Sequence, residues 1–431
     1  MENEKLKMEN YKQTELGHIP DDWEVNRFTD IAELIHGFQF REEHFAENGR
    51  FGVIKIGNLT YQGNISLDNL SKSDCEGINN YERLFLRRGD ILMALTGGTL
   101  GKMSIFNLEE NRYLQNYRVG KFEPNEKSIK NYIYYLLSST YVQKRIEDNV
   151  NEAAQPNFGK QDFDKIKIPL PPLPEQKKIA DCLSTWDSAI EKQSALINAL
   201  TDRKKALMQQ LLTGKKRLPG FSGEWKEVKL GSICENFQNG NAFSAKDYKK
   251  TGIPIVTMGN INLGGYFYFS ESKSNFWIED KSLERYEIKK GDLIIAMTDV
   301  TPEKNLIGLT SIIDIDRIFY LNQRVGHIIL KPKLADTDFI FYLSQNSYWR
   351  NQCKAFATLG VQANLGTNDI KNINIKLPSL SEQTAIAEIL ATADRELQLQ
   401  KEKLAQLQTQ KKGLMQDRKS TRLNSSHDQR S

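Results

Sequence analysis

One long phrase occurs twice in this chain of 431 residues, first at residues 170–190 and again at residues 377–397. The first copy reads LPPLPEQKKIADCLSTWDSAI and the second reads LPSLSEQTAIAEILATADREL. Self-similarity at a large offset marks a duplication in which each copy is one structural unit. The repeat therefore restricts the architecture to two similar halves.

Shorter landmarks recur in the same order. They are GN at 57 and 259, GD at 89 and 291, and N-x-R-V-G at 116 and 322. The offset drifts from 202 to 207 positions along the chain, as insertions in an old duplication would make it do. The duplication thus covers nearly the whole sequence.

Each copy begins with a part that favours a compact mixed α and β domain. Short β-rich runs bounded by Gly and Asn are expected at residues 53–56, 90–95 and 117–119, and at 254–257, 292–297 and 324–325. Helical patterns follow near residues 129–146 and 338–352. The same small domain is therefore predicted twice.

The second part of each copy carries apolar residues at steps of four and three, the a and d positions of a coiled coil. The seam consists of Ile179, Leu183, Trp186, Ile190, Ile197, Leu200, Leu207 and Leu211 in the first copy, and of Ile386, Leu390, Leu397, Leu404, Leu407 and Leu414 in the second. Its polar interruptions recur as well, Gln193 with Gln400 and Lys204 with Lys411.

A helix with such a seam has to bury it, and the chain supplies a second helix of matching period. We therefore expect an α+β fold, internally duplicated, in which two mixed domains are separated by two long helices that form an antiparallel coiled coil. About 40 residues at about 1.5 Å each make a helix of about 60 Å. The Pro-rich run predicts no helix before Glu175. The alternative is two separate helices, each packed only on its own domain.

The composition is that of a soluble globular protein, with 39% hydrophobic, 10% aromatic and 26% charged residues. No apolar run approaches the roughly 20 residues that span a bilayer, and the first residues lack a signal core, so we expect a cytoplasmic protein with no membrane partner. Four scattered cysteines and five histidines predict buried thiols and no metal site. A net charge of +4 permits an anionic partner without identifying one.

Several motifs together resemble the specificity subunit of type I restriction-modification systems. They are YKQTELGHIPDDWEV at 11–25, LPGFSGEWKEVKLGSI at 218–233, the paired GD strands, AAQPNFGKQDF at 153–163, and the repeated LPPLPEQ phrase. The resemblance covers residues 11–416. It implies two target recognition domains, at 1–170 and 218–377, each reading one half of a bipartite DNA sequence. Spacer helices at 171–217 and 378–416 would set the distance between the half-sites.

The resemblance also implies partners. Two modification subunits would methylate adenine with S-adenosylmethionine, and restriction subunits would translocate and cleave DNA with ATP and Mg²⁺, while this chain binds double-stranded DNA and performs no chemistry. In agreement, the chain has no Asp/Asn-Pro-Pro-Tyr/Phe tetrapeptide and no complete GxxxxGK[ST]. The alternatives are a self-contained DNA methyltransferase or nuclease, and a coiled-coil scaffold that does not bind DNA.

Polar residues beside the expected strands are the candidates for DNA contact, because side-chain amides, hydroxyls and cations read base edges and hold phosphates. They are Lys55, Asn58, Thr60, Tyr61, Gln62, Arg118, Gln155 and Asn157 in the first domain, and Asn260, Asn262, Thr298, Lys304, Arg324, Gln362 and Asn364 in the second. Each is equally consistent with an ordinary solvated loop residue. Two roles are open for Arg118 and Arg324: they contact phosphate, or they pair with an acid in the core of each domain. We favour the second role.

The last residues depart from the repeat. Arg418 stands where the first copy has Leu211, and residues 417–431 form an atypical polar tail that we expect to be disordered or foreign to the repeat.

Overall fold

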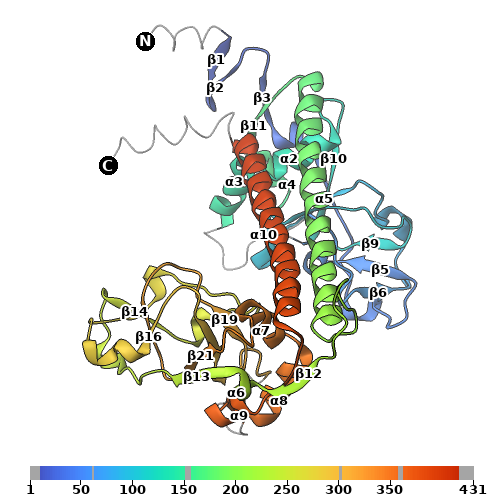
Figure 1. Ribbon diagram of the computed structural model, residues 1–431. Coiled ribbons are helices and arrows are strands. Elements are labelled where there is room, and N and C mark those ends of the chain that lie inside the picture. Colours follow the sequence, from blue (N-terminus) through green and yellow to red (C-terminus); the bar gives the residue numbers. More distant parts are fainter. Residues whose placement is uncertain (1–9, 61–62, 151–156, 300–302, 358–362, 417–431) are drawn as a thin grey trace. The chain divides into compact units, whose positions relative to one another are not determined.

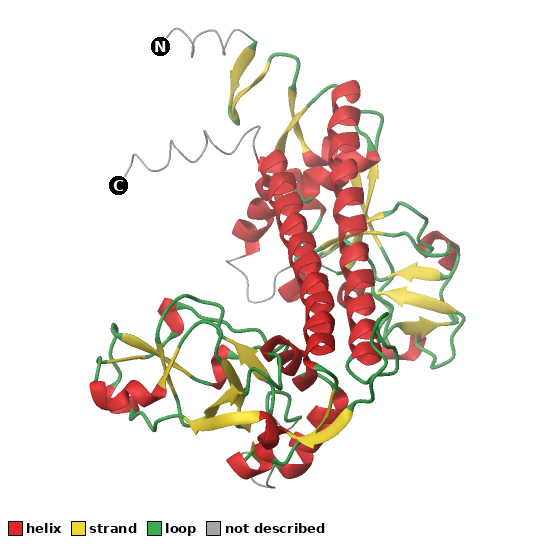
Figure 2. Cartoon of the chain, in the orientation of Figure 1, coloured by secondary structure: helices red, strands yellow, loops and turns green. Residues whose placement is uncertain are grey.

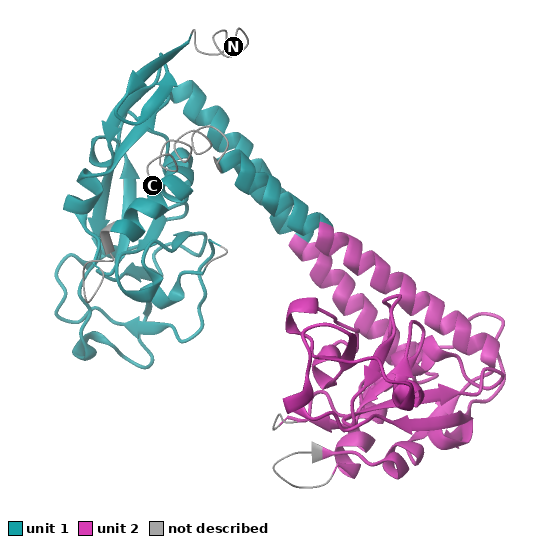
Figure 3. Ribbon diagram, turned by 90° about the vertical axis from the view of Figure 1, so that its left-hand side faces the viewer, with its two compact units in different colours: residues 1–193, 403–431 teal, residues 194–402 magenta. Residues whose placement is uncertain are grey.

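The computed structural model describes residues 10–60, 63–150, 157–299, 303–357 and 363–416. The chain divides into two units, one formed by residues 1–193 with 403–431 and the other by residues 194–402 (Figure 3). Each unit holds one globular head together with part of both long helices, α5 (Leu173–Leu211) and α10 (Leu380–Gln416) (Figure 1).

The first head is built on an antiparallel four-stranded sheet. Its strands follow in the order β4 (Ala32–His36), β10 (Val119–Pro124), β7 (Ile91–Ala94) and β8 (Met103–Ile105). A second sheet has the order β6 (Ser71–Ser73), β5 (Phe51–Ile54) and β9 (Tyr113–Gln115), with β5 and β9 parallel. Two strand pairs join β1 (Tyr11–Thr14) to β2 (Gly17–Pro20) and β3 (Glu24–Arg27) to β11 (Lys167–Leu170).

The second head repeats this plan. Its main sheet has the order β13 (Cys234–Asn239), β21 (Val325–Leu330), β17 (Leu293–Ala296) and β19 (Thr310–Ile312). The second sheet has the order β15 (Phe276–Trp277), β14 (Ile253–Val256), β20 (Phe319–Leu321) and β16 (Glu287–Ile288). Strand pairs join β12 (Lys226–Lys229) to β23 (Asn374–Leu377) and β18 (Thr298–Asp299) to β22 (Ala363–Asn364).

Short helices complete both heads (Figure 2). The α-helices are α2 (Lys130–Leu137), α3 (Thr140–Val150), α4 (Lys160–Asp164), α6 (Leu230–Ile233), α7 (Thr337–Ser344), α8 (Ser347–Phe356) and α9 (Thr367–Lys371). The 3-10 helices are η1 (Phe28–Asp30), η2 (Glu42–His44), η3 (Ile56–Asn58), η4 (Tyr81–Leu84), η5 (Gly97–Thr99), η6 (Ala245–Asp247), η7 (Met258–Asn260), η8 (Glu271–Lys273) and η9 (Lys281–Tyr286).

The central strand of each head is buried on both faces. Ile91 and Met93 of β7 pack in one apolar cluster with residues of α2 and α3, whereas Leu92 and Ala94 pack in another cluster with Ile54 of the second sheet. Successive side chains of a strand point to opposite faces, so a continuous apolar run is needed wherever both faces are covered. The same alternation along β17 places it between α7 and the second sheet of its own head.

The two long helices are antiparallel within each unit. In the second unit, Lys204 of α5 contacts Asp394 of α10 at 2.5 Å, and further along α5 the end residue Leu211 shares an apolar cluster with Ile386. Residue numbers thus rise along one helix while they fall along the other. In the first unit, Asp187 of α5 contacts Lys411 of α10. The predicted internally duplicated α+β fold with an antiparallel coiled coil is confirmed, and the alternative of two separate helices is wrong.

Two details of the helices differ from the sequence-based prediction. Each expected helix near residues 129–146 and 338–352 is a pair of helices, broken at Ser138–Ser139 and at Gln345–Asn346. α5 begins at Leu173 instead of Glu175, because Pro174 lies in the first turn, where its missing N–H costs no intrahelical hydrogen bond.

The repeated phrase fastens each long helix to its head through one buried glutamine. Gln176 accepts a hydrogen bond from Ile129 N–H (3.0 Å) and donates to the carbonyls of Lys127 and Pro171 (2.9 Å each). Its counterpart Gln383 makes the same three kinds of bond, and both side chains are fully buried. The glutamine of the repeated EQ pair thus explains why this phrase recurs.

Candidate nucleic-acid interface

In the first head, three segments meet at the end of the central strand. Leu95 N–H, just after β7, donates to the carbonyl of Arg118 (2.9 Å), and Phe158 N–H donates to the carbonyl of Leu95 (2.9 Å). Thr96 forms an isolated β-bridge with Asn157. Arg118 and Asn157 are both exposed. Two predicted site residues from distant parts of the sequence therefore lie at one strand end.

The second head repeats this meeting point. Met297 N–H donates to the carbonyl of Arg324 (3.0 Å), and Leu365 N–H donates to the carbonyl of Met297 (2.8 Å). Thr298 pairs with Asn364 between β18 and β22. Arg324 and Asn364 are exposed. We call these residues the strand-end clusters: Thr96, Arg118 and Asn157 in the first head, and Thr298, Arg324 and Asn364 in the second.

The two arginines of the strand-end clusters face solvent. Asn116 and Asn322 hold the turn before them, since each side-chain oxygen accepts the N–H two residues on, at 3.1 and 3.2 Å. The guanidinium of Arg118 donates to the hydroxyl of Tyr117 (2.6 Å). The favoured interpretation, that Arg118 and Arg324 pair with acids inside the cores, is therefore wrong for these exposed side chains.

A glycine in each head allows the chain to pass close to this turn. A Cβ on Gly37 would lie 2.1 Å from the carbonyl oxygen of Gln115, and one on Gly240 would lie 2.2 Å from that of Asn322. No larger residue fits these positions without moving the backbone. Sequence reasoning missed both glycines, although each stands at the same place in its copy of the repeat.

The predicted residues Asn58 and Asn260 lie inside their heads, with 5% and 9% of their surface exposed. Their side-chain oxygens accept the N–H of Lys55 (2.9 Å) and Thr257 (2.8 Å). Their side-chain amide groups donate to the carbonyl eight residues further on, at 3.0 and 2.9 Å. Because these groups are used within the chain, we assign both asparagines a structural role in shaping the loop that follows.

Lys55 is held by its own head. Its ammonium group donates to the hydroxyl of Ser71 (2.7 Å) and lies 3.9 Å from the centre of the Phe45 ring. Burial lowers the pKa of Lys55. The side chain is half-buried and fixed in position, so DNA contact through Lys55 stays a prediction.

Of the remaining predicted residues, Thr60 and Asn262 stabilise loops and Thr298 lies in strand β18. The Thr60 hydroxyl donates to the carbonyl four residues on (2.9 Å), and the side-chain oxygen of Asn262 accepts the N–H groups of Gly264 (2.8 Å) and Tyr266 (3.1 Å). Thr298 is buried and its hydroxyl donates to the thioether of Met258. Tyr61, Gln62, Gln155 and Gln362 lie outside the described residues.

Arg350 of α8 shapes the loop that carries the predicted residue Lys304. Its guanidinium donates to the carbonyls of Asn305 (2.8 Å), Lys304 (3.2 Å) and Ile307. Burial lowers the pKa of Arg350. No sequence pattern pointed to this residue, because only the fold brings α8 to this loop.

The polar interruption of the seam in the second unit is a compact ionic cluster. The ammonium group of Lys204 contacts the Asp394 carboxylate and donates to the Tyr266 hydroxyl (2.8 Å), while Tyr342 donates to the same carboxylate (2.8 Å). Burial, and then the neighbouring Asp394, raise the pKa of both tyrosines. The cluster links both long helices to the second head.

The first unit contains the matching cluster. Lys411 of α10 contacts Asp187 of α5, and the Tyr135 hydroxyl donates to Asp187 (2.7 Å). Burial and the Asp187 carboxylate raise the pKa of Tyr135. The lysines predicted only as seam interruptions therefore have defined partners in the opposite helix and in the head.

Replacing Lys204 with methionine is expected to lower the free energy of unfolding by about 1–3 kcal/mol, because Asp394 would keep its half-buried charge without its ammonium partner. Urea unfolding followed by circular dichroism measures the change. The matched control is Lys205→Met on the exposed face of the same helix. Equal shifts for both variants would contradict a role for the ionic cluster.

The seam residues of α5 all lie on its buried or half-buried face, as do those of α10 up to Lys411. Leu414 is the exception, because 47% of its surface is exposed. Met415 instead packs against the apolar cluster of Leu183 in the first unit. The last turn of α10 thus advances by four residues from Lys411, where the prediction used three, and the assignment of Leu414 to the seam is wrong.

Within the described residues, no cluster of three or more His, Cys, Asp or Glu side chains is placed to hold a metal ion. Among the same residues, no helix combines the length and apolar character needed to cross a membrane. Cys75, Cys234 and Cys353 are buried as expected, whereas Cys182 is exposed, so the expectation of buried thiols is wrong for that residue.

The model of the type I restriction modification DNA specificity domain matches this chain twice, at residues 20–202 and 222–409. Each match spans one head and most of the long helix that follows it. The two matches together cover most of the sequence and coincide with the repeat.

Curated relatives match this chain over most of its length and of their own. The MjaVIII specificity subunit of a type I restriction enzyme from Methanocaldococcus jannaschii is 28% identical, over 95% of this chain and 95% of the relative. The EcoKI specificity subunit from Escherichia coli is 21% identical, over 86% and 82%. A crystal structure of a type I restriction-modification S subunit from M. genitalium covers 91% of this chain and 95% of its own, with a TM-score of 0.56 at 16% identity, and shares the fold.

Proposed function

This chain belongs to the type I restriction-modification DNA specificity family and is a DNA-recognition subunit, and on that premise we propose how the work is divided within it. Each head reads one half of a two-part DNA sequence. The antiparallel helix pair sets the number of unspecified base pairs between the halves and docks the modification subunits.

The observation that carries this proposal is the pair of equivalent heads with non-equivalent polar side chains. The two heads share one backbone framework. Asn58 and Asn260, for example, hold equivalent turns by the same hydrogen bonds. Matched loop positions nevertheless differ, with Thr60 in one head and Asn262 in the other. Two copies of one framework that present different donors and acceptors suit a target whose halves differ in sequence.

The strand-end clusters supply the phosphate contacts in this proposal. Arg118 and Arg324 are exposed at equivalent places, and a guanidinium group donates paired hydrogen bonds to phosphate oxygens. Asn157 and Asn364 lie beside them. Loss of either arginine would weaken binding on all sequences, because phosphate contacts carry no base information.

The chemistry belongs to partners in this proposal. Two modification subunits bring S-adenosylmethionine, restriction subunits bring ATP and Mg²⁺, and this chain contributes recognition without catalysis. We place the assembly in the cytoplasm.

A methylation assay tests the proposal. Duplex DNA is incubated with S-adenosylmethionine and with this chain alone, its modification partner alone, or the co-expressed complex. Adenine methylation at one two-part sequence is expected from the complex only. Methylation by the chain alone would favour the self-contained enzyme, and a complex that retains no duplex in a gel shift would favour the scaffold.

Insertion of seven residues into both long helices is expected to lengthen the unspecified gap by about 3 base pairs, since seven helical residues span about 10 Å and a base pair about 3.4 Å. The insertions follow Gln193 and Glu402, where the two units meet in sequence, so contacts within each unit are kept. Mapping of methylated adenines measures the gap.

An insertion in one helix alone is the control, because it keeps the seam on one helix face but shifts that helix by two turns along its partner, so the contacts between the two helices no longer match. An unchanged gap in an active complex with both insertions would contradict the spacing role of the helices.

A further inference from the structure

The second head carries a short loop, residues 261–268, whose shape is fixed by its own hydrogen bonds. Its two ends pair in an isolated β-bridge. Between them, the side-chain oxygen of Asn262 accepts the N–H groups of Gly264 (2.8 Å) and Tyr266 (3.1 Å). We call residues 262–266 the tip loop. Its conformation is set before any ligand binds.

Two side chains of the tip loop face solvent. Leu263 is exposed over 69% of its surface, more than any other large apolar residue among those described. Asn262 is also exposed. Because its oxygen accepts two backbone N–H groups, the orientation of its amide is determined, and its nitrogen has no hydrogen-bond partner in the described part of the chain. The tip loop thus offers one hydrogen-bond donor beside one apolar side chain.

This pair of groups matches one base in the major groove of DNA. Thymine presents the O4 acceptor and the C5 methyl group there, and the other three bases present no methyl group. The usual contact of asparagine with adenine also needs the side-chain oxygen as an acceptor, and in Asn262 that oxygen is already engaged within the loop. A free donor next to an exposed leucine therefore fits a T·A base pair.

One side chain fastens the tip loop to the long helices. The Tyr266 hydroxyl accepts a hydrogen bond from the ammonium group of Lys204 in α5 (2.8 Å), and this lysine contacts Asp394 of α10. The Tyr266 ring lies 5.9 Å from the ring of Phe341 in α7. Because these partners lie outside the loop, they fix its position and not only its shape.

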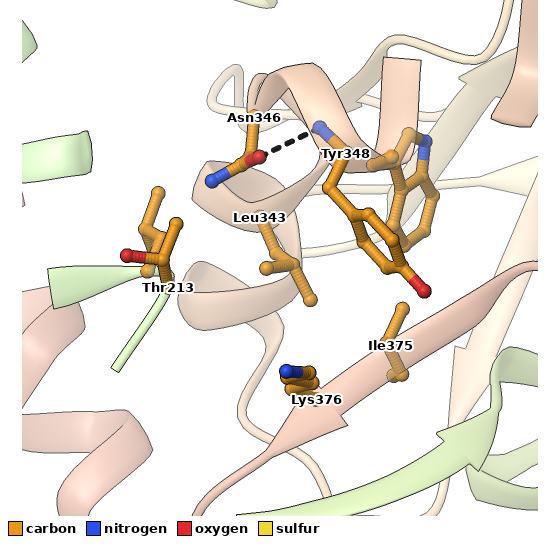
Figure 4. A pocket seen from close by; sticks show the side chains of 8 residues that line it. Thr213, Leu343, Asn346, Tyr348, Ile375 and Lys376 are labelled. Carbon is orange, nitrogen blue, oxygen red and sulfur yellow. Dashed lines mark hydrogen bonds between the residues drawn. The ribbon is translucent and has the colours of Figure 1, made fainter. Parts of the chain in front are cut away.

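A glycine brings the tip loop against α7. A Cβ on Gly265 would lie 2.9 Å from the carbonyl oxygen of Thr310 and 3.2 Å from the Phe341 ring, and its φ of +79° favours glycine. The end of α7 is itself held, because Asn346, between α7 and α8, accepts the N–H of Tyr348 at 2.8 Å and begins α8 (Figure 4). The tip loop is therefore seated on a fixed part of its head.

The first head has the same loop without this anchor. Thr60 N–H donates to the carbonyl of Asn64 (2.9 Å), as Asn262 N–H does to that of Tyr266 (3.1 Å). Asn64 stands at the position of Tyr266, is exposed, and makes no side-chain hydrogen bond within the described residues. The tyrosine anchor is therefore a property of the second head.

We propose that the tip loop reads a T·A base pair in the half-site of the second head. Leu263 contacts the C5 methyl group of the thymine, the Asn262 amide donates to its O4, and Tyr266 is the positioning residue that holds both side chains at the groove. This inference rests on the proposed function, in which each head reads one half of the target.

Deoxyuridine tests the contact of Leu263, because it lacks only the methyl group of thymidine. The complex of the full chain with its modification subunits is titrated with its target duplex, known from the mapping of methylated adenines, in which each thymine of either strand is replaced in turn. One replacement in the half-site of the second head is expected to weaken binding about fourfold, the effect of one buried methyl group. In Leu263→Ala that replacement is expected to have no further effect, because the contact is already lost.

Leu334→Ala is the matched control, because Leu334 is an exposed leucine of the same head outside the loop. It should keep the response of the unmodified chain. If Leu263→Ala responds to every replacement as the unmodified chain does, this inference is overturned while the proposed function stands. A complex that binds target and random duplexes equally would overturn the proposed function as well.

Asn262→Asp tests the donor. The carboxylate still accepts the N–H groups of Gly264 and Tyr266, but it has no proton to donate to thymine O4 and instead accepts from the N4 amino group of cytosine. The preference for T·A over C·G at this base pair is expected to fall at least about tenfold. An unchanged preference contradicts the assignment of Asn262.

Tyr266→Phe removes only the hydroxyl that Lys204 holds. It is expected to reduce the deoxyuridine effect at that position to less than about twofold, because the loop loses a charge-assisted hydrogen bond, and to leave the effects in the other half-site unchanged. Tyr268→Phe is the matched control, since Tyr268 is exposed in the same loop and its hydroxyl has no hydrogen-bond partner among the residues described. Equal responses of the two variants would show that the anchor does not position the loop.

Discussion

Exchange of the first head for the head of another specificity subunit is expected to change one half of the methylated sequence completely, and to leave the other half and the gap unchanged. The reason is that each head carries its own strand-end cluster and its own loops, held by contacts within that head. Genome-wide mapping of methylated adenines in cells that express the hybrid with its modification subunits measures all three properties at once.

The structure also determines where the exchange must end. β3 pairs with β11, with Arg27 opposite Lys167, so a junction before residue 167 would divide this ladder between two proteins. A junction after Pro171 keeps the ladder in the grafted part and α5 in the host. Gln176 then still finds its partners, because all three are backbone groups.

A reciprocal exchange of residues 218–377 should change only the other half of the target. The chain's own first head, regrafted through the same junctions, is the control for damage at the junctions. A hybrid that alters both halves of the methylated sequence would show that the heads do not read DNA independently.

Replacement of Gln383 with leucine is expected to lower the free energy of unfolding by about 2–5 kcal/mol, the largest stability change among the variants considered. The side chain is fully buried, and its loss leaves the N–H of Asp336 and the carbonyls of Leu334 and Pro378 without their hydrogen-bond partner. Urea unfolding followed by circular dichroism measures the change.

Gln410→Leu is the matched control, because Gln410 lies on the exposed face of the same helix and the substitution is chemically identical. Gln176→Leu should reproduce the effect in the first unit, where the glutamine makes the same bonds. Similar stabilities for Gln383→Leu and Gln410→Leu would show that the buried glutamine does not fasten the helix to the head.

Much of the architecture could be predicted from residue spacing. The seam from Ile179 to Leu211 has the period of a paired helix, and both copies carry it, so the sequence favoured the antiparallel pair over two separate helices. The run at Ile91–Ala94 was recognised as a strand because it is short, apolar and bounded by glycines, and the structure buries it on both faces.

The candidate site was less predictable. Asn58 and Asn260 look like exposed loop residues in the sequence, and the fold buries both as turn supports. Arg118 and Arg324 were expected in the cores and are exposed at a strand end. The asparagines bond to groups three and eight residues away in the same loop, whereas the backbone of each arginine is bonded to the distant residue Leu95 or Met297. Neither kind of contact can be read from a short residue pattern.

The sequence by itself determined that there are two copies of one domain and that a long amphipathic helix follows each, and it favoured pairing of the helices, because repeat and period are properties of residue order. Only the tertiary structure decided which polar groups reach solvent and that Leu414 leaves the seam in favour of Met415. Those outcomes depend on contacts between residues far apart in the chain, where volume and hydrogen-bond partners are set by the packed neighbours and not by spacing along the sequence.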